Sequence, residues 1–154
     1  WAPEHRGVQL TMRELNRQYG KTPALWSADH TPDGFTWLEK DAAQENLLAF
    51  VRHAAAGHDD GRDLVCLTHL SGVERQGYRL GVPSAGQWEI VLDTSDAALA
   101  GRAEDAAAQD ALLAQRSMST VTAEDTPWHG QDHSVVVNVP ALTTLWLRPR
   151  CGTM

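Results

Sequence analysis

The chain opens with apolar side chains at helical spacing. Positions i, i+4, i+7 and i+11 of one helical face are occupied by Val8, Met12, Leu15 and Tyr19. This pattern predicts a helix over residues 3–20, with Leu10 on the opposite side and Gly20 as its C-terminal stop. Such a helix must bury its apolar stripe, so we expect a packing partner for it outside this chain, with Leu10 facing the residues that follow.

A second short helical turn is predicted after the first helix. Thr22 is a suitable N-cap and Pro23 a suitable first helical residue of a turn that ends near Trp26. The sequence DHTPDG at residues 29–34 is rich in turn-forming residues and is typical of a boundary.

From Phe35 onward the hydrophobic period changes from helical to two, which is typical of β-strands. Strands separated by Gly, Pro or polar turns are predicted at residues 35–37, 46–52, 63–70, 78–82, 87–92, 135–139 and 142–147. The alternation places Trp88, Ile90 and Leu92 on one face. Short antiparallel strands at near-regular spacing predict a mainly β chain that ends in an antiparallel β-sandwich. Its expected core includes three tryptophans, Trp37, Trp88 and Trp146.

One segment breaks the strand pattern. Residues 95–115 are rich in alanine and contain Asp, Glu and Gln, with little preference for β structure. Two interpretations stay open, a helix over residues 105–118 or a mobile insertion at about 95–118 between two strands.

Composition narrows the classes of partner. The net charge is −7, and no basic stripe interrupts it, which argues against a nucleic-acid partner. No apolar run approaches the roughly 18–20 residues of a membrane helix. The two cysteines, Cys66 in an apolar run and Cys151 in the tail, form no disulfide framework, so we expect a reducing, cytoplasmic setting. Because the chain begins at Trp1 rather than Met, we also expect a segment of a longer polypeptide.

Few residues suggest chemistry by themselves. The acidic residues Glu39, Asp41 and Glu45 are the nearest approach to a carboxylate cluster, and we interpret them as a solvated loop. Four potential metal ligands lie close together in the sequence, His53, His58, Asp59 and Asp60. We interpret them as part of a polar hairpin tip, because they lack the spacing of zinc or calcium sites. No metal site, cofactor or nucleophile is predicted.

Several segments in fixed order resemble the C-terminal part of the 1,4-α-glucan (glycogen) branching enzymes, which belong to the α-amylase superfamily. They are HRGVQ at 5–9, LNR at 15–17, PAL at 23–25, GFTWL at 34–38, GYRLGVP at 77–83, GQWEIVLDT at 86–94 and PWHG at 127–130. After residue 94 the chain departs from the family, which usually has a glycine-rich connection where this chain has its alanine-rich segment.

The resemblance implies that residues 1–30 form the helical end of a catalytic (β/α)8 barrel and residues 31–154 a C-terminal β-sandwich. The parent enzyme would cut an α-1,4 glucan and transfer it to a 6-hydroxyl, forming an α-1,6 branch. That chemistry needs two carboxyl groups about 5–5.5 Å apart, and no residue here matches the family's catalytic carboxylates. The implied role is therefore supporting, with the upstream barrel and α-glucan as partners.

Trp128 and His129 are the candidate substrate-binding residues. An exposed indole offers a flat apolar face to a glucose ring, and a histidine can donate to its hydroxyls; alternatively, Trp128 only caps the edge of the sandwich. Two other functions stay open. The chain could be a stand-alone carbohydrate-binding module with at least two solvent-facing indoles, or the tail of another glucan-active member of the superfamily, such as a hydrolase.

Overall fold

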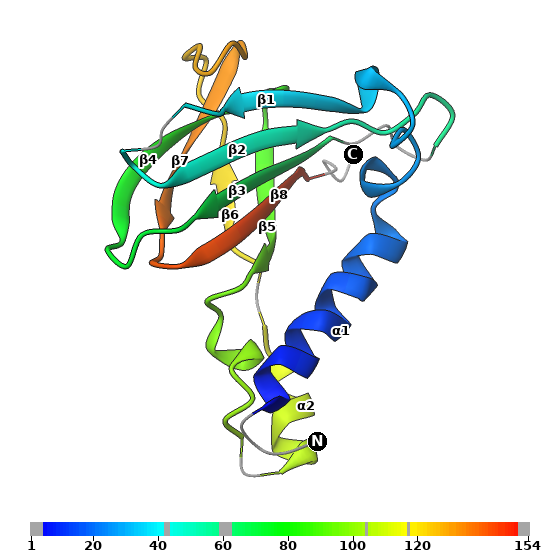
Figure 1. The fold of residues 1–154 in the computed structure, drawn as a ribbon, viewed down its shortest axis with the longest axis vertical. Helices are drawn as coiled ribbons and strands as arrows, with labels where there is room; N and C mark the ends of the chain where they lie inside the picture. Colours follow the sequence, from blue (N-terminus) through cyan, green and yellow to red (C-terminus); the bar gives the residue numbers. More distant parts are fainter. Residues whose placement is uncertain (1–4, 42–43, 59–62, 104, 117, 151–154) are drawn as a thin grey trace.

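The computed structural model describes residues 5–41, 44–58, 63–103, 105–116 and 118–150 (Figure 1). The elements follow in the order α1 (Arg6–Lys21), η2 (Pro23–Leu25), η3 (Pro32–Gly34), β1 (Phe35–Glu39), β2 (Leu47–Arg52), β3 (Leu64–His69), β4 (Arg75–Val82), β5 (Gln87–Asp93), η5 (Ala97–Leu99), α2 (Ala106–Ala114), β6 (Thr120–Thr122), β7 (His133–Val139) and β8 (Thr143–Pro149). No helix in these ranges is long and apolar enough to cross a membrane.

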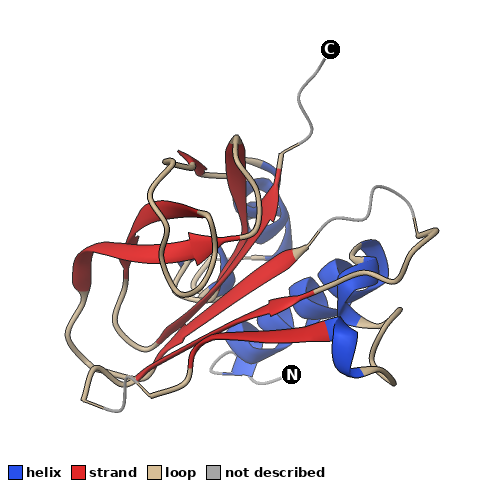
Figure 2. Ribbon diagram, turned by 90° about the horizontal axis from the view of Figure 1, so that it is seen from above, coloured by secondary structure: helices blue, strands red, loops and turns tan. Residues whose placement is uncertain are grey.

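The strands form the predicted antiparallel sandwich, in two unequal layers. One sheet has six strands in the order β1-β2-β3-β8-β5-β6, and the other pairs β4 with β7. The main core lies between the layers, where fully buried Leu47, Leu67 and Leu147 of the large sheet meet Leu80 and Val137 of the small one. Figure 2 shows the helices on the other side of the large sheet, so that sheet is covered on both faces.

The last strand of the chain, β8, lies in the middle of the large sheet. β8 pairs with β3 along one edge, with Val65 opposite Leu147, and with β5 along the other, with Ile90 opposite Leu147. β2 and β3 form the predicted antiparallel pair, with Val51 opposite Val65. The last strand therefore depends on long-range pairing with segments far upstream.

A β-bulge in β5 allows this strand to place side chains in hydrophobic clusters on both faces of the large sheet. The pairing with β8 shifts register between Ile90 and Leu92. Trp88 lies in the main core, whereas Val91 and Leu92 are buried in clusters on the helix side of the sheet. The prediction that Trp88, Ile90 and Leu92 share one face is wrong for Leu92, because a β-bulge interrupts the alternation.

Helix α1 differs in two details from the predicted helix over residues 3–20. Residues 3 and 4 lie outside the described residues, and the described helix continues through Gly20 to Lys21. Gly20 is not in the left-handed conformation typical of a glycine stop; the helix is capped instead by the backbone N–H of Thr22, which donates to the carbonyl of Tyr19 at 3.4 Å. The turn predicted around Pro23 is present as the 3-10 helix η2, but the Thr22 side chain makes no capping hydrogen bond.

The alanine-rich segment contains the helical alternative predicted for it. The Asp105 side chain accepts from the N–H of Ala108 at 2.8 Å and caps α2, and the Asp96 side chain accepts from Ala98 at 2.8 Å and caps η5. These short helices pack beside the start of α1 (Figure 1). The three-residue strand β6, which pairs with β5, was not predicted because it is too short to show an alternation.

Of the three tryptophans predicted for the core, one is buried, one is partly buried and one is exposed. Trp88 is fully buried and donates from its indole nitrogen to the carbonyl of Ser84 at 3.0 Å. Trp146 is partly buried under the helices. The prediction for Trp37 is wrong, since 49% of it is exposed. It lies opposite Phe50 on edge strand β1, with its ring against Phe35 and Phe50.

Candidate functional site

A cavity of about 720 Å³ lies where the end of β1, the start of β4 and the loop before β7 meet. This volume falls in the range of about 300–1,000 Å³ that is usual for small-molecule sites. Its lining joins the two sequence-predicted binding residues to the three predicted loop carboxylates, and consists of Glu39, Asp41, Gln44, Glu45, Arg75, Gln76, Gly77, Tyr78, Arg79, Trp128 and His129.

A tight turn positions the two predicted binding residues. Trp128 and Gln131 exchange backbone hydrogen bonds of 3.0 and 2.9 Å. The two residues between them, His129 and Gly130, have φ values of 51° and 74°. A two-residue loop with positive φ at both positions is a type I′ turn, which fixes the direction of the flanking side chains. Histidine is among the non-glycine residues that tolerate this conformation best.

Gly81 on β4 allows this turn to lie against the sheet. A Cβ atom at Gly81 would be only 2.3 Å from the carbonyl oxygen of Trp128 and 3.0 Å from the Cβ of His129. Any side chain there would push the turn away. The segments GYRLGVP and PWHG, which are far apart in the sequence, are therefore in direct contact in the fold.

The backbone also determines which nitrogen of His129 carries its proton. The N–H of Gly81 donates to His129 Nδ1 at 3.4 Å, so Nδ1 is the acceptor and Nε2 bears the proton. Nε2 faces Glu39 Oε2 at 3.8 Å, beyond direct hydrogen-bond distance. Burial lowers the pKa of His129, and the nearby charge of Glu39 raises it only in part. The imidazole is thus held neutral near pH 7.

Aromatic rings flank His129 on two sides. The ring centroids of Trp128 and Tyr78 lie 5.8 and 6.2 Å from that of His129. Trp128 is 47% exposed, so its indole offers a face to solvent. Burial raises the pKa of Tyr78 to about 12, helped by the charges of Glu39 and Glu45, so its hydroxyl keeps its proton at neutral pH.

Ion pairs offset much of the charge in the cavity wall. Arg75 lies 3.4 Å from Glu45. Arg79 donates to Glu124 at 2.7 Å and to the Ser134 hydroxyl at 2.8 Å. The lining contains three carboxylates and two guanidinium groups, and one of these, Arg79, pairs with Glu124 outside the lining. The wall therefore has many hydrogen-bonding groups and a small excess of negative charge. This arrangement suits a neutral, hydroxyl-rich ligand better than an anion.

The predicted polar hairpin contains no described metal site. His53 Nδ1 lies 2.8 Å from Asp63 and its Nε2 2.9 Å from the hydroxyl of Thr36, while His58 packs edge-on against Trp26. Asp59 and Asp60 lie outside the described residues. Among those that are described, no group of three His, Cys, Asp or Glu side chains is arranged to hold a metal ion.

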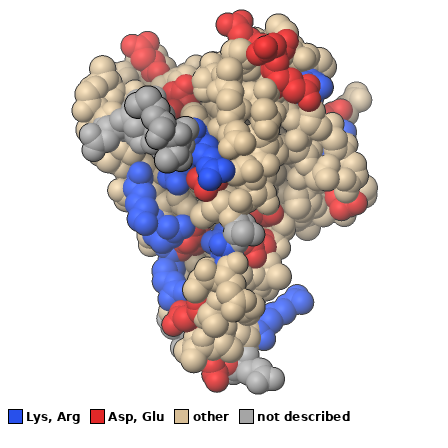
Figure 3. All heavy atoms as spheres, turned by 180° about the vertical axis from the view of Figure 1, so that it is seen from behind, with Lys and Arg blue, Asp and Glu red and all other residues tan. Residues whose placement is uncertain are grey.

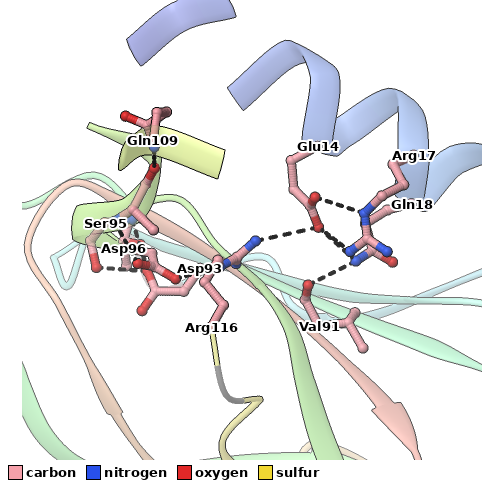
Figure 4. Close-up of polar contacts among 11 residues, drawn as sticks. Glu14, Arg17, Gln18, Val91, Asp93, Ser95, Asp96, Gln109 and Arg116 are labelled. Carbon is pink, nitrogen blue, oxygen red and sulfur yellow. Dashed lines mark hydrogen bonds and ion pairs between the residues drawn. The ribbon is translucent and has the colours of Figure 1, made fainter. Parts of the chain in front are cut away.

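A second polar cluster, which the sequence did not predict, joins α1 to the alanine-rich segment. Buried Glu14 accepts two hydrogen bonds from Arg17, at 2.8 and 2.6 Å, and one from Gln18 at 2.9 Å (Figure 4). Arg116, which follows α2, lies 3.6 Å from Glu14 and donates to Asp96 at 2.6 Å. The only signal in the sequence was the i, i+4, i+8 spacing of Leu10, Glu14 and Gln18.

Glu14 is ionised in this cluster. Burial by itself would raise the pKa of Glu14, but the hydrogen bonds from Arg17 and Gln18 outweigh it and hold the pKa below its ordinary value. Gln18 also donates to the carbonyl of Val91, at the β-bulge, at 2.9 Å. At the start of the helix, Gly7 lies so close to η5 that a Cβ would be 2.9 Å from the carbonyl oxygen of Ala100. The sandwich and the alanine-rich segment together thus hold α1 along most of its length.

The opposite side of α1 is only partly covered by the described residues. Val8, Met12 and Tyr19 of the predicted stripe are 63%, 51% and 51% exposed, while Leu15 is partly buried against the cluster that contains Leu92 and Leu99. The basic residues of α1, among them the exposed Arg13 and Arg17, lie along another part of its exposed side; basic side chains gather over this region in Figure 3. The helix therefore has a largely polar face that contacts the rest of the chain and an apolar face that is exposed to solvent.

Comparison with known proteins agrees with the resemblance predicted from the sequence. Residues 37–150 match the family model described as alpha amylase, C-terminal all-beta domain. The chain is 42% identical over 148 residues to the 1,4-alpha-glucan branching enzyme GlgB of Burkholderia vietnamiensis, covering 96% of this chain and 18% of that protein. The corresponding identities to the enzymes of Kitasatospora aureofaciens and Nocardia farcinica are 39% over 149 residues and 37% over 145 residues.

The covered share is similar in all three relatives. The chain spans 18% of the length of each relative and 94–96% of its own length is matched. The similarity thus concerns one part of a longer protein, and it includes α1 as well as the sandwich, because it extends beyond the residues of the family model. With its two-layered antiparallel fold, its paired GYRLGVP and PWHG segments and these matches, the chain belongs to the family of α-amylase C-terminal all-β domains, in the form found in 1,4-α-glucan branching enzymes.

Proposed function

We propose that this chain is the C-terminal part of a 1,4-α-glucan branching enzyme and that it supports, but does not perform, the reaction. The parent enzyme would be a glycosyltransferase of glycogen synthesis that cuts an α-1,4 glucan and rejoins it as an α-1,6 branch. Support comes from the relatives, which are named branching enzymes and match this chain over nearly all of its length. No residue of the chain is assigned to catalysis.

The observation that carries this proposal is the two-sided helix α1. One face is fixed to the sandwich through Leu10, Glu14 and Gln18. The other presents the exposed apolar residues Val8, Met12 and Tyr19. Contiguous apolar surface of this kind is typical of a protein contact. We assign the catalytic barrel of the parent enzyme as the partner, because each relative continues well beyond the matched 18% of its length.

In this proposal residues 1–30 complete the barrel and residues 31–154 form the supporting domain. The contacts of α1 with β5, η5 and α2 then make a continuous connection from barrel to sandwich. We also place the parent enzyme in the cytoplasm. The buried free thiol of Cys66 is consistent with a reducing compartment.

A chimera tests the proposal. The part of the Burkholderia vietnamiensis enzyme that matches this chain is replaced by the chain itself, all 154 residues of it. Met12→Asp places a charge in the apolar stripe, and Gln9→Asp places the same charge at an exposed polar position of the same helix. We expect the unaltered chimera and Gln9→Asp to form α-1,6 branches, and Met12→Asp to lose most branching activity and to unfold at a lower temperature.

The isolated chain provides the control for folding. Because Met12 is 51% exposed there, Met12→Asp should change the free energy of unfolding of the isolated chain by no more than about 0.5 kcal/mol. Equal behaviour of Met12→Asp and Gln9→Asp in the chimera would refute the assigned contact. A soluble chimera that forms no branches would refute the proposed function.

The other candidate functions have less support. The matched relatives are branching enzymes, which disfavours the tail of a glucan hydrolase. A stand-alone carbohydrate-binding module predicts at least two solvent-facing indoles, and Trp37 and Trp128 are 49% and 47% exposed. These two tryptophans lie on separate elements, an edge strand and a turn. Their exposure is equally compatible with sugar contacts in a domain of an enzyme and with an independent binding module. Retention of the isolated chain on immobilised glycogen would be expected in both cases.

A further inference from the structure

We propose that the cavity beside Trp128 binds a short stretch of α-1,4-linked glucan, with the indole stacked on one glucose ring and with Glu39 and His129 bonded to one of its hydroxyls. This inference rests on the proposed function for the identity of the sugar only. The cavity, its aromatic wall and its polar groups are features of the described residues.

The aromatic wall supplies the apolar contact. A glucose ring presents C–H groups on its faces and hydroxyls around its edge, so it packs face-on against an aromatic ring while its edge stays polar. The exposed Trp128 indole offers such a surface at the mouth of the cavity, and Tyr78 extends the apolar wall behind His129. Large, rigid aromatic side chains lose little conformational entropy when they make this contact.

The gap between Glu39 and His129 fits a hydroxyl group. The 3.8 Å between Nε2 and Oε2 leaves the Nε2–H without a close bond to the carboxylate. A sugar hydroxyl beside both atoms would accept from Nε2–H and donate to Oε2, satisfying both groups. Because the N–H of Gly81 holds Nδ1 as an acceptor, the ring is oriented with its proton toward the cavity before any ligand arrives.

The charges favour this neutral ligand over a phosphate. The carboxylates of Glu39 and Asp41 would repel an anion, and Arg75 and Arg79 already pair with Glu45 and Glu124. The type I′ turn and the close contact of Gly81 with Trp128 hold the aromatic wall in place. A site that is formed in advance loses less free energy to ordering on binding.

Titration with maltoheptaose, followed through the indole N–H signals of the 15N-labelled chain, tests the site. The Trp128 signal is identified by its loss in Trp128→Phe, which keeps an aromatic face at this position. We expect the Trp128 signal to shift with maltoheptaose. Trp128→Ala should weaken binding about tenfold, and Glu39→Ala by a smaller factor. Trp26→Ala, which removes another indole at 36% exposure, should leave the affinity unchanged.

Three results would overturn the inference. They are an unmoved Trp128 signal at millimolar maltoheptaose, wild-type affinity in Trp128→Ala, and stronger binding of inorganic phosphate than of the sugar. Should a variant fail to fold, the signals of the unaltered chain still decide the question. None of these results affects the Met12→Asp experiment on the chimera, so failure of this site and failure of the proposed function can be told apart.

Discussion

Replacement of Glu14 tests whether the buried polar cluster holds α1 on the sandwich. In Glu14→Gln the side chain keeps its shape and one acceptor oxygen but loses its charge. The change removes charge-assisted hydrogen bonds from Arg17 at 2.8 and 2.6 Å and leaves Arg116, whose side chain is 11% exposed, with Asp96 as its remaining carboxylate.

The size of the effect follows from these contacts. Hydrogen bonds to charged groups contribute about 1.5–3 kcal/mol each. Arg17 is 41% exposed, so solvent screens its share, whereas Arg116 is nearly buried. We expect Glu14→Gln to lower the free energy of unfolding by about 2–3 kcal/mol at pH 7. For a chain of this length that corresponds to a fall in Tm of about 4–12 °C.

The pH dependence gives a second measurement of the same cluster. Since the pKa of Glu14 is lower in the folded than in the unfolded chain, the stabilisation is fully present above 4.5 and is lost as the pH falls through the folded pKa. Urea unfolding followed by tryptophan fluorescence, repeated from pH 7 to pH 3, should show the wild-type and Glu14→Gln curves converging at the acid end.

An exposed glutamate provides the matched control. Glu74→Gln removes the same charge from a solvent-exposed position whose Oε1 accepts from Gln76, and it should change stability by no more than about 0.5 kcal/mol. Hydrogen exchange should accelerate in α1 of Glu14→Gln but not in β2 or β3. Equal stability of the two variants at pH 7, or a constant difference down to pH 3, would refute the reasoning.

Three further predictions concern single residues. Gly81→Ala should lower the free energy of unfolding by about 1–3 kcal/mol, because its Cβ meets the Trp128 carbonyl at 2.3 Å, whereas Gly20→Ala, with open space around it, should be neutral or stabilising in denaturation experiments. In a Cys151→Ser background the Cys66 thiol should resist a thiol reagent at pH 8 until the chain unfolds, since burial raises its pKa to about 12. The pKa of His129 is lowered from 6.5 in the folded chain, so the wild-type free energy of unfolding should fall as the pH drops below 6.5. In unfolding experiments, His129→Asn should lose less stability than the wild type over the same pH range.

Most strands were predictable because half-buried strands require alternation. Segments 35–37 and 78–82 carry that period and lie in β1 and β4, whereas 46–52 and 63–70, which correspond to β2 and β3, were predicted from their apolar content. The exceptions have local causes. Leu92 changes face at a bulge, and β6 is only three residues long. Trp37 is exposed because β1 is an edge strand, and an apolar period cannot tell an edge strand from a central one.

The helix and the cavity show a different limit of the sequence. The stripe of α1 was visible from its period, but the face that binds the sandwich is largely polar and gave Leu10 as its one hydrophobic signal. Trp128 and His129 were singled out by residue type alone. Their meeting with Glu39 and Tyr78 depends on the pairing of β4 with β7 and on the contact at Gly81, which are long-range features that no local pattern encodes.

The hydrogen bond from Gln18 to the carbonyl at the β5 bulge has a mechanical consequence. A displacement of α1 by one turn would bring either Glu14, whose ionised side chain cannot donate, or Thr22, beyond the helix end, opposite that carbonyl. This hydrogen bond therefore opposes axial sliding, together with the contacts of Gly7 and Glu14, and a force on the outward side of the helix is transmitted to β5.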